Sequence, residues 1–179
     1  MIILIGASAS GKTEVCKALC YSFGYKKFVT TTTRSKRRGE IDGIDYFFVT
    51  NEEFDKRVKE NKFIEHILYN GNQYGTEKNQ IDDKTVLVLE PDGLKEFKKL
   101  NDPHIISFFL KSSSNIRKER MRIRGDEESV IEKRLILDEN KFNKANMTPA
   151  DFEIDSDKET IKELANEIHS LYIKKIEAN

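Results

Sequence analysis

The chain has 179 residues, enough for one domain with a substantial core and some smaller appended segments. Its 31 basic and 31 acidic residues balance, so no overall charge draws it to nucleic acid or to a membrane surface. The longest apolar run, Met1–Ile5, is too short to span a bilayer and lacks the features of a secretion signal. Cys16 and Cys20 are the only cysteines, so no disulfide framework is expected and a cytoplasmic location is predicted.

Apolar runs and helical patterns alternate from the beginning of the chain. Ile2–Ile5 predicts a short buried strand that leads through Gly6–Thr13 into a helix. Phe28–Thr31 predicts a second strand, and Arg34–Glu40 a polar, basic loop after it. The residues that the first helix should turn inward are Val15, Cys16, Leu19 and Cys20.

The middle of the chain predicts a helix and a hairpin. Thr50 and Glu53 fit a capping box, so a helix should begin directly after Thr50. Phe63–Tyr69 and Asn72–Gly75 flank Asn70-Gly71, a pair that favours a tight type I′ turn. Residues 40–75 are therefore expected to form a two-stranded insert.

The second half returns to the alternating pattern. Thr85–Leu89 and the second half of His104–Leu110 predict buried strands, and Phe152–Ile154 predicts a last short one. One helix should run from Ser113 or Ser114 to Arg124 and another should follow Gly125-Asp126. The closing amphipathic helix should bury Ile161, Leu164, Ala165, Ile168, Leu171 and Tyr172. Strands alternating with helices predict an α/β fold with a parallel sheet covered on both faces.

The first loop carries a phosphate-binding motif. Its residues fit G-x-x-x-x-G-K-[ST], the P-loop, as Gly6-Ala7-Ser8-Ala9-Ser10-Gly11-Lys12-Thr13. Backbone N–H groups and the helix N-terminus would surround a triphosphate, Lys12 would reach its β and γ phosphates, and Thr13 would ligate Mg²⁺. The alternative is a glycine-rich turn before an ordinary helix. Ala9 stands where a third glycine is common, and alanine is tolerable there if its φ is negative.

The basic loop indicates a second anion site. Arg34 and Arg37 could clamp a dianionic phosphate, although such a run is as often a solvated or nonspecific anionic patch. The motifs that follow it, in order, are Asp42-Gly43-Ile44-Asp45-Tyr46-Phe47-Phe48, Phe63-Ile64-Glu65 and Gly71-Asn72-Gln73-Tyr74-Gly75-Thr76. With the P-loop and the T-T-R-x-x-R-x-G-E run, this series resembles guanylate kinase from Ile2 to about Arg134, and more weakly over Phe152–Asp155.

The resemblance implies a fold and its parts. It implies a P-loop NTPase, a three-layer α/β/α parallel sheet with a small mixed α+β acceptor lobe and a helical lid. Residues 1–179 would be a single kinase domain. Its core would be residues 1–33, 77–114 and 142–179, its GMP-binding lobe about 34–76 and its lid about 115–141.

It also implies roles for the acceptor site. The GMP phosphate would be held by Arg34, Arg37, Tyr46 and Tyr74, and the guanine would be read by Glu65, Thr30 and Thr76. A carboxylate can accept both donors of guanine, N1–H and the 2-amino group, whereas adenine lacks that pair. Taken alone, Glu65 could instead face solvent, and the two tyrosines could pack the small lobe.

The end of the third predicted strand departs from the family. Guanylate kinases usually show two aspartates here, where this chain has Val88 and Glu90. Glu90 can replace the second acid and contact GMP or hold Mg²⁺ through water, but Val88 cannot replace the first.

The resemblance assigns Arg120, Arg124 and Arg134 to the lid and, with Lys12 and Arg34, to catalysis. Positive charge around the transferring phosphoryl group stabilises the transition state. The alternative is a solvated basic helix face, paired with Glu119, Glu127 and Glu128. His66, His104 and His169 show no metal-ligand spacing.

The sequence thus predicts transfer of the ATP γ-phosphate to GMP, with Mg²⁺ and without a covalent enzyme intermediate. The expected partners are ATP and GMP, without nucleic acid or membrane, in a monomer or homodimer. One alternative is a guanylate-kinase-like binding module with weak or no catalysis, of the kind found in scaffold proteins. Another is a related small-molecule P-loop kinase.

Overall fold

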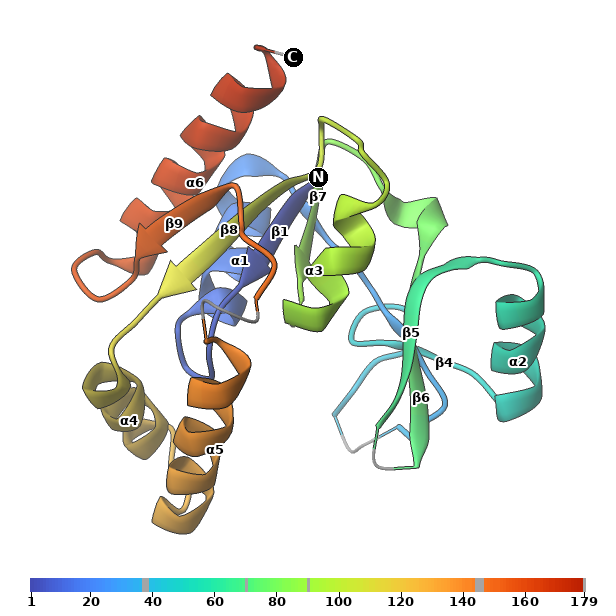
Figure 1. The fold of residues 1–179 in the computed structure, drawn as a ribbon, viewed down its shortest axis with the longest axis horizontal. Coiled ribbons are helices and arrows are strands. Elements are labelled where there is room, and N and C mark those ends of the chain that lie inside the picture. The colour runs from blue at the N-terminus through green and yellow to red at the C-terminus, as the bar shows by residue number, and fades with distance from the viewer. Residues whose placement is uncertain (37–38, 70, 90, 144–146, 179) are drawn as a thin grey trace. The chain divides into compact units, whose positions relative to one another are not determined.

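The computed structural model describes residues 1–36, 39–69, 71–89, 91–143 and 147–178. The chain divides into two compact units, Met1–Lys27 with Asp83–Asn179, and Phe28–Asp82. Each unit has its own sheet (Figure 1). Within the described ranges, no helix combines the length and the apolar character needed to cross a membrane.

The first unit is built on a five-stranded parallel sheet in the order β2-β7-β1-β8-β9. Its strands are β1 (Ile2–Ile5), β2 (Lys26–Lys27), β7 (Thr85–Val88), β8 (Ile106–Lys111) and β9 (Phe152–Asp155). Ile3 lies between Leu87 of β7 and Ser107 of β8, so β1 is the central strand. Because the strands are parallel, the loops that leave β1 and β8 start at the same edge of the sheet.

Helices surround this sheet. They are α1 (Lys12–Phe23), α3 (Pro91–Lys98), α4 (Ser114–Ile123), α5 (Glu128–Lys141) and α6 (Ile161–Ile176). The helices α1 and α6 pack together, and α3 lies on the other face of the sheet in Figure 1. The helices α4 and α5 pack against each other beside the loop that follows β1.

Alternate residues of the strands supply the core, as the two-residue period of a strand requires. Ile2 and Leu4 join Phe108 in one cluster with the apolar faces of α1 and α6. Ile3 and Leu87 point to the opposite face and are equally buried. At the start of α6, the Thr160 side chain and Glu163 form a reciprocal capping box.

The second unit is a four-stranded mixed sheet in the order β4-β3-β6-β5. Its elements are β3 (Thr31–Thr32), β4 (Phe47–Phe48), α2 (Asn51–Lys59), β5 (Phe63–Tyr69), β6 (Asn72–Glu77) and a 3₁₀ turn, η1 (Lys78–Gln80). Phe54 of α2 stacks on Phe63 of β5 with ring centroids 4.5 Å apart, and both are buried. A side chain at Gly75 would meet the Phe63 ring at 2.7 Å, so this aromatic pair requires glycine there.

The predicted α/β fold with a central parallel sheet is confirmed. The strand predicted at Phe28–Thr31 is wrong in its bounds, because the chain forms β2 before it and β3 at Thr31–Thr32. The expected two-stranded insert is also wrong, since β3 and β4 join the hairpin of β5 and β6. Asn70 of the predicted turn lies outside the described residues, and Gly71 has a positive φ of 75°.

Candidate active site

The loop between β1 and α1 presents backbone donors at a helix N-terminus. Gly11 is the N-cap of α1 at φ 99°, a conformation that favours glycine, and no side chain of the described residues caps the helix there. The first N–H groups of a helix have no intrahelical acceptor and carry partial positive charge. These N–H groups therefore lie where the sequence predicts a phosphate cradle.

The conformation of this loop involves the Lys12 side chain and close packing at Gly6. Lys12 Nζ donates to the carbonyls of Gly6 and Ala7, with 3.0 Å to the second. Gly6 is needed because a side chain there would meet Ser10 Oγ at 2.5 Å and the Leu110 carbonyl at 2.7 Å. Ser10 is fully buried, and its hydroxyl has no hydrogen-bond partner among the described residues. The absence of a Cβ at Gly6 therefore lets the loop pack closely on Ser10 and on the end of β8.

The backbone of Ala9 does not have the negative φ that would make alanine tolerable at this position. Its φ is +60°, in the left-handed region, where alanine is less stable than glycine by about 1 kcal/mol. The conformation is retained, so contacts around the loop must hold it.

The three arginines predicted for the lid lie on α4 and α5 or at their ends, but they have different partners. Arg120 Nη1 donates to the Ala9 carbonyl at 3.3 Å, and its Nη2 donates to the Ser156 carbonyl at 2.7 Å. Arg124 and Arg134 instead both bind Asp126. These bonds, first that of Arg124, hold the pKa of the Asp126 carboxyl below its usual range. The solvated-face alternative fits Arg122, which pairs with Glu128.

Two buried charged residues at the loop were missed by sequence reasoning. Arg117 of α4 and Asp138 of α5 form an ion pair of 2.7 Å, and both are less than a tenth exposed. Asp138 also accepts from Ser8 N–H at 2.9 Å and from Ser8 Oγ at 3.3 Å. The sequence holds one indication for Asp138, which lies two helical turns after the buried Ile131 and therefore on the same face of α5.

In the second unit, Arg34 lies among aromatic rings and a carboxylate. Its guanidinium is 5.4 Å from the centroid of Tyr46 and 5.7 Å from that of Phe48. It pairs with Glu40 at 2.7 Å, and this bond is the main cause that raises the Arg34 pKa. Tyr46 and Tyr74 meet edge to face at 6.1 Å. Three of the predicted phosphate-binding residues therefore gather in one place, with Glu40 as a partner that the sequence did not indicate.

The predicted base-reading residues Glu65 and Thr76 are also brought together. They are cross-strand partners on β5 and β6, and Thr76 Oγ1 donates to Glu65 Oε1 at 2.5 Å. Thr30, the third of this set, precedes β3, and its carbonyl accepts from Phe47 N–H at 2.9 Å.

The remaining residues that the sequence singled out are Arg37, Glu90, Val88 and Thr13. Arg37 and Glu90 are outside the described residues. Val88 ends β7 as a partly buried apolar residue against the core cluster, so it packs where the family has an acid. Thr13 is exposed on the first turn of α1.

The described part of the chain holds no group of three or more His, Cys, Asp or Glu side chains placed to bind a metal. The histidines have structural neighbours. His169 stacks on Phe23 and bonds to the Tyr25 hydroxyl, and His104 bonds to Asp83.

Comparison with known proteins agrees with this geometry. The family model described as guanylate kinase matches residues 1–171. A guanylate kinase of Fusobacterium nucleatum subsp. nucleatum is 32% identical over 142 residues, which cover 75% of this chain and 77% of the relative. One of Clostridium tetani is 37% identical over 133 residues, covering 71% of this chain and 64% of the relative.

A solved structure leads to the same family. The guanylate kinase of Anaplasma phagocytophilum superposes with a TM-score of 0.63 at 28% identity, over 97% of this chain and 85% of that one. The family match over almost the whole chain and the placement of the loop residues agree. The chain belongs to the guanylate kinase family of phosphotransferases.

Proposed function

We propose that this chain transfers the γ-phosphoryl group of ATP to GMP, giving ADP and GDP. The observation that carries the choice of acceptor is the content of the second unit. One small sheet and the loop beside it hold both an arginine beside two tyrosines, Arg34 with Tyr46 and Tyr74, and a carboxylate–hydroxyl pair, Glu65 with Thr76. A nucleoside monophosphate carries a phosphate and a base that suit these two features.

ATP would bind the loop from Ala7 to Thr13. Backbone N–H groups would hold the phosphates, and Lys12 would exchange the carbonyls of Gly6 and Ala7 for the β and γ phosphates. Ammonium–phosphate bonds are charge-assisted and stronger than bonds to neutral carbonyls.

Mg²⁺ fits this donor set through Thr13. Its hydroxyl is a hard oxygen ligand, exposed at the first turn of α1, and Mg²⁺ in kinases keeps most of its ligands from phosphates and water. The ion would supply neutralisation of the charge on the β and γ oxygens. Val88 offers it no ligand, and Glu90 keeps the role proposed from the sequence.

GMP would be recognised through its base and its phosphate. Glu65 would accept N1–H and the 2-amino group, and the Thr76 hydroxyl, now bound to Glu65, could turn to O6 with that of Thr30. Arg34, Arg37, Tyr46 and Tyr74 would hold the phosphate. For this Arg34 must exchange its ion pair with Glu40 for the dianion.

The transfer step would require the lid arginines to contact the transferring phosphoryl group. Arg120, Arg124 and Arg134 would surround the equatorial and bridging oxygens while a GMP phosphate oxygen attacks in line. Arg124 and Arg134 would have to exchange Asp126 for the phosphates. The helices α4 and α5 would thereby act as the proposed lid over residues 115–141.

The proposed domain organisation remains that of a single kinase domain with core, acceptor lobe and lid. The proposed partners are the two nucleotides, without nucleic acid or membrane, in a monomer or homodimer. A cytoplasmic location is proposed from the state of the two cysteines. Cys16 and Cys20 are free thiols, which accords with a reducing compartment.

The proposal is tested by ATP consumption and nucleotide analysis of the products. With Mg·ATP, GMP should be converted to GDP, and omission of Mg²⁺ should abolish turnover. Binding of GMP without turnover would instead indicate a binding module, and phosphorylation of a non-nucleotide would indicate the related small-molecule kinase.

A further inference from the structure

One buried ion pair binds the N–H group, the side chain and the carbonyl group of Ser8. Asp138 accepts from Ser8 N–H at 2.9 Å and from Ser8 Oγ at 3.3 Å. Arg117 Nη1 lies 2.7 Å from the same carboxylate and 3.4 Å from the Ser8 carbonyl. We call Arg117 and Asp138 the Ser8 clamp.

The clamp is buried deeply for a pair of charges. Arg117 is 5% exposed and Asp138 8% exposed. Arg117 Nε has no hydrogen-bond partner among the described residues. Buried ion pairs add little net stability compared with apolar side chains of the same size. Packing alone therefore gives little reason for charges at these two positions.

The residue next to Ser8 needs support from its surroundings. Ala9 has a φ of +60°, and an L-residue with a Cβ leaves that region readily. Its neighbours limit this relaxation, since Ser8 is fixed by the clamp and Arg120 binds the Ala9 carbonyl. Backbone strain persists only where the surrounding structure determines it.

We propose that Arg117 and Asp138 are positioning residues for ATP binding: they fix Ser8 and thereby hold Ala9 in the left-handed conformation of the phosphate loop. The clamp thus stabilises a left-handed conformation that glycine at position 9 would adopt without support. The proposal rests on the proposed function in one respect, that the loop from Ala7 to Thr13 binds ATP. Neither clamp residue is required to touch the nucleotide.

The test is a double-mutant cycle between the clamp and Ala9. The clamp is removed by the double substitution Arg117→Met with Asp138→Leu, which leaves no single charge buried. The same substitutions are made in an Ala9→Gly background, where the backbone reaches the left-handed region without a Cβ. The dissociation constant of Mg·ATP is measured for all four proteins by calorimetric titration without GMP.

Clamp removal should weaken Mg·ATP binding about tenfold in the wild-type background and less than about threefold in the Ala9→Gly background. An equal loss in the two backgrounds, or no loss in the wild-type background, overturns the proposal. If the clamp variant unfolds with alanine at this position and folds with glycine, the rescue supports it. Unfolding in both backgrounds overturns it, because the pair then serves the whole fold.

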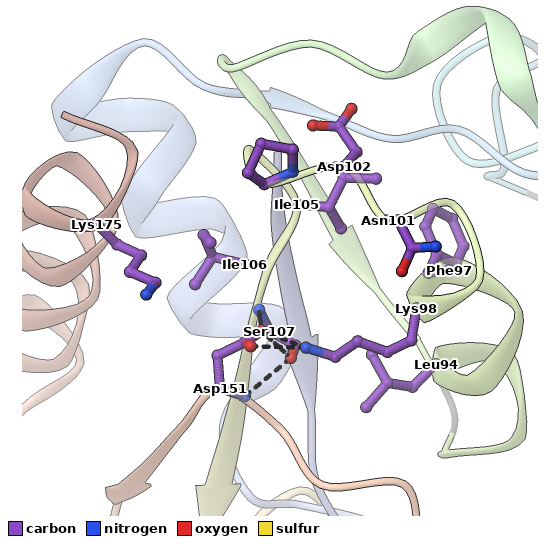
Figure 2. Close-up of a pocket in the computed structure, with 11 residues that line it drawn as sticks. Leu94, Phe97, Lys98, Asn101, Asp102, Ile105, Ile106, Ser107, Asp151 and Lys175 are labelled. Atoms are coloured by element: carbon purple, nitrogen blue, oxygen red, sulfur yellow. Dashed lines mark hydrogen bonds and ion pairs between the residues drawn. The ribbon is translucent and has the colours of Figure 1, made fainter. Parts of the chain in front are cut away.

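Asp138→Asn is a second variant, which keeps the shape of the side chain and removes its charge. It should show the same rescue by Ala9→Gly. The matched control is Asp151→Asn, because Asp151 also accepts from three donors, Lys98 Nζ at 2.7 Å, Ser107 N at 2.8 Å and Ser107 Oγ at 2.6 Å. It lines a pocket of about 280 Å³ beside α3 (Figure 2), and none of the described residues that line this pocket belongs to the phosphate loop. Its effect on Mg·ATP binding should be the same with alanine or glycine beside Ser8.

The two proposals fail separately. If the wild-type protein binds Mg·ATP and does not phosphorylate GMP, the proposed function fails and the cycle can still be measured. If GMP is phosphorylated and the cycle shows no coupling, only the clamp proposal fails.

Discussion

Glu65 and Thr76 lie opposite each other on β5 and β6, and the Thr76 hydroxyl donates to the Glu65 carboxylate at 2.5 Å. This bond uses one carboxylate oxygen, and an ionised carboxylate can accept several more hydrogen bonds. The pair therefore suits a ligand that presents two parallel donors, as guanine does.

Glu65→Gln should raise the KM for GMP by about tenfold to a hundredfold and leave the KM for ATP within about twofold. The NH₂ group of glutamine would face one of the two guanine donors, and that donor would then have no acceptor. Steady-state kinetics with each substrate varied in turn measures this. Glu60→Gln, an exposed change in the same unit, is the control and should alter neither KM. Equal effects on the two KM values would count against the base assignment.

Lys12→Ala should lower kcat by about a thousandfold or more, because the lysine would stabilise charge on the transferring phosphoryl group. Lys17→Ala is the control on the same helix, since Lys17 is exposed and pairs with Glu14. Single-turnover measurements would separate the chemical step from product release. An unchanged kcat in the Lys12 variant would refute the role of the loop.

Ala9→Gly should stabilise the protein by about 1 kcal/mol, because it removes the Cβ from a left-handed residue. The midpoint of urea unfolding should rise at constant m value. Asn101→Gly is the matched control at φ 50°, and its gain should be smaller because asparagine tolerates this region. Destabilisation by Ala9→Gly would show that the φ of Ala9 is not positive in solution.

Asp151 should contribute a stability that depends on pH. Burial raises its pKa, but hydrogen bonds from Lys98 and Ser107 outweigh burial and leave the pKa below the usual value. A carboxyl group with a lowered folded-state pKa stabilises the fold above its unfolded-state pKa, which is about 4. That stability is lost as the pH falls through the lower folded-state value.

Asp151→Asn should therefore lower the free energy of unfolding by about 2 kcal/mol at about pH 7, and the difference from wild type should shrink below about pH 4. Urea unfolding between about pH 2 and about pH 7 measures both curves. A difference that stays constant over this range would contradict the lowered pKa.

The strands and helices that the sequence predicted well share one property, a periodic apolar pattern long enough to read. Ile2–Ile5 and the closing helix, which is α6, are examples. The missed strands β2 and β4 have two residues each, too few for any period. Thr31–Thr32 pairs with β6, far along the chain, and such distant pairing overrides local propensity.

The candidate site could be predicted only in part for a related reason. Motif residues such as Lys12 and Glu65 stand out by type and spacing. Asp138 and Arg117 do not, because each is one charged residue on a helix among many, and the spacing of Asp138 from Ile131 does not by itself show that the carboxylate is buried. The left-handed φ of Ala9 could not be read either, since backbone strain is set by the surrounding structure.

The most direct test is the rate of ATP consumption by the wild-type chain with GMP, dGMP, AMP, CMP and UMP, each with and without Mg²⁺. The account predicts that, with Mg²⁺, kcat/KM for GMP exceeds that for AMP, CMP and UMP by at least about a hundredfold, with GDP and ADP formed in equal amounts. Turnover of AMP at a rate similar to that of GMP, or no turnover of GMP by a protein that binds ATP, would contradict it.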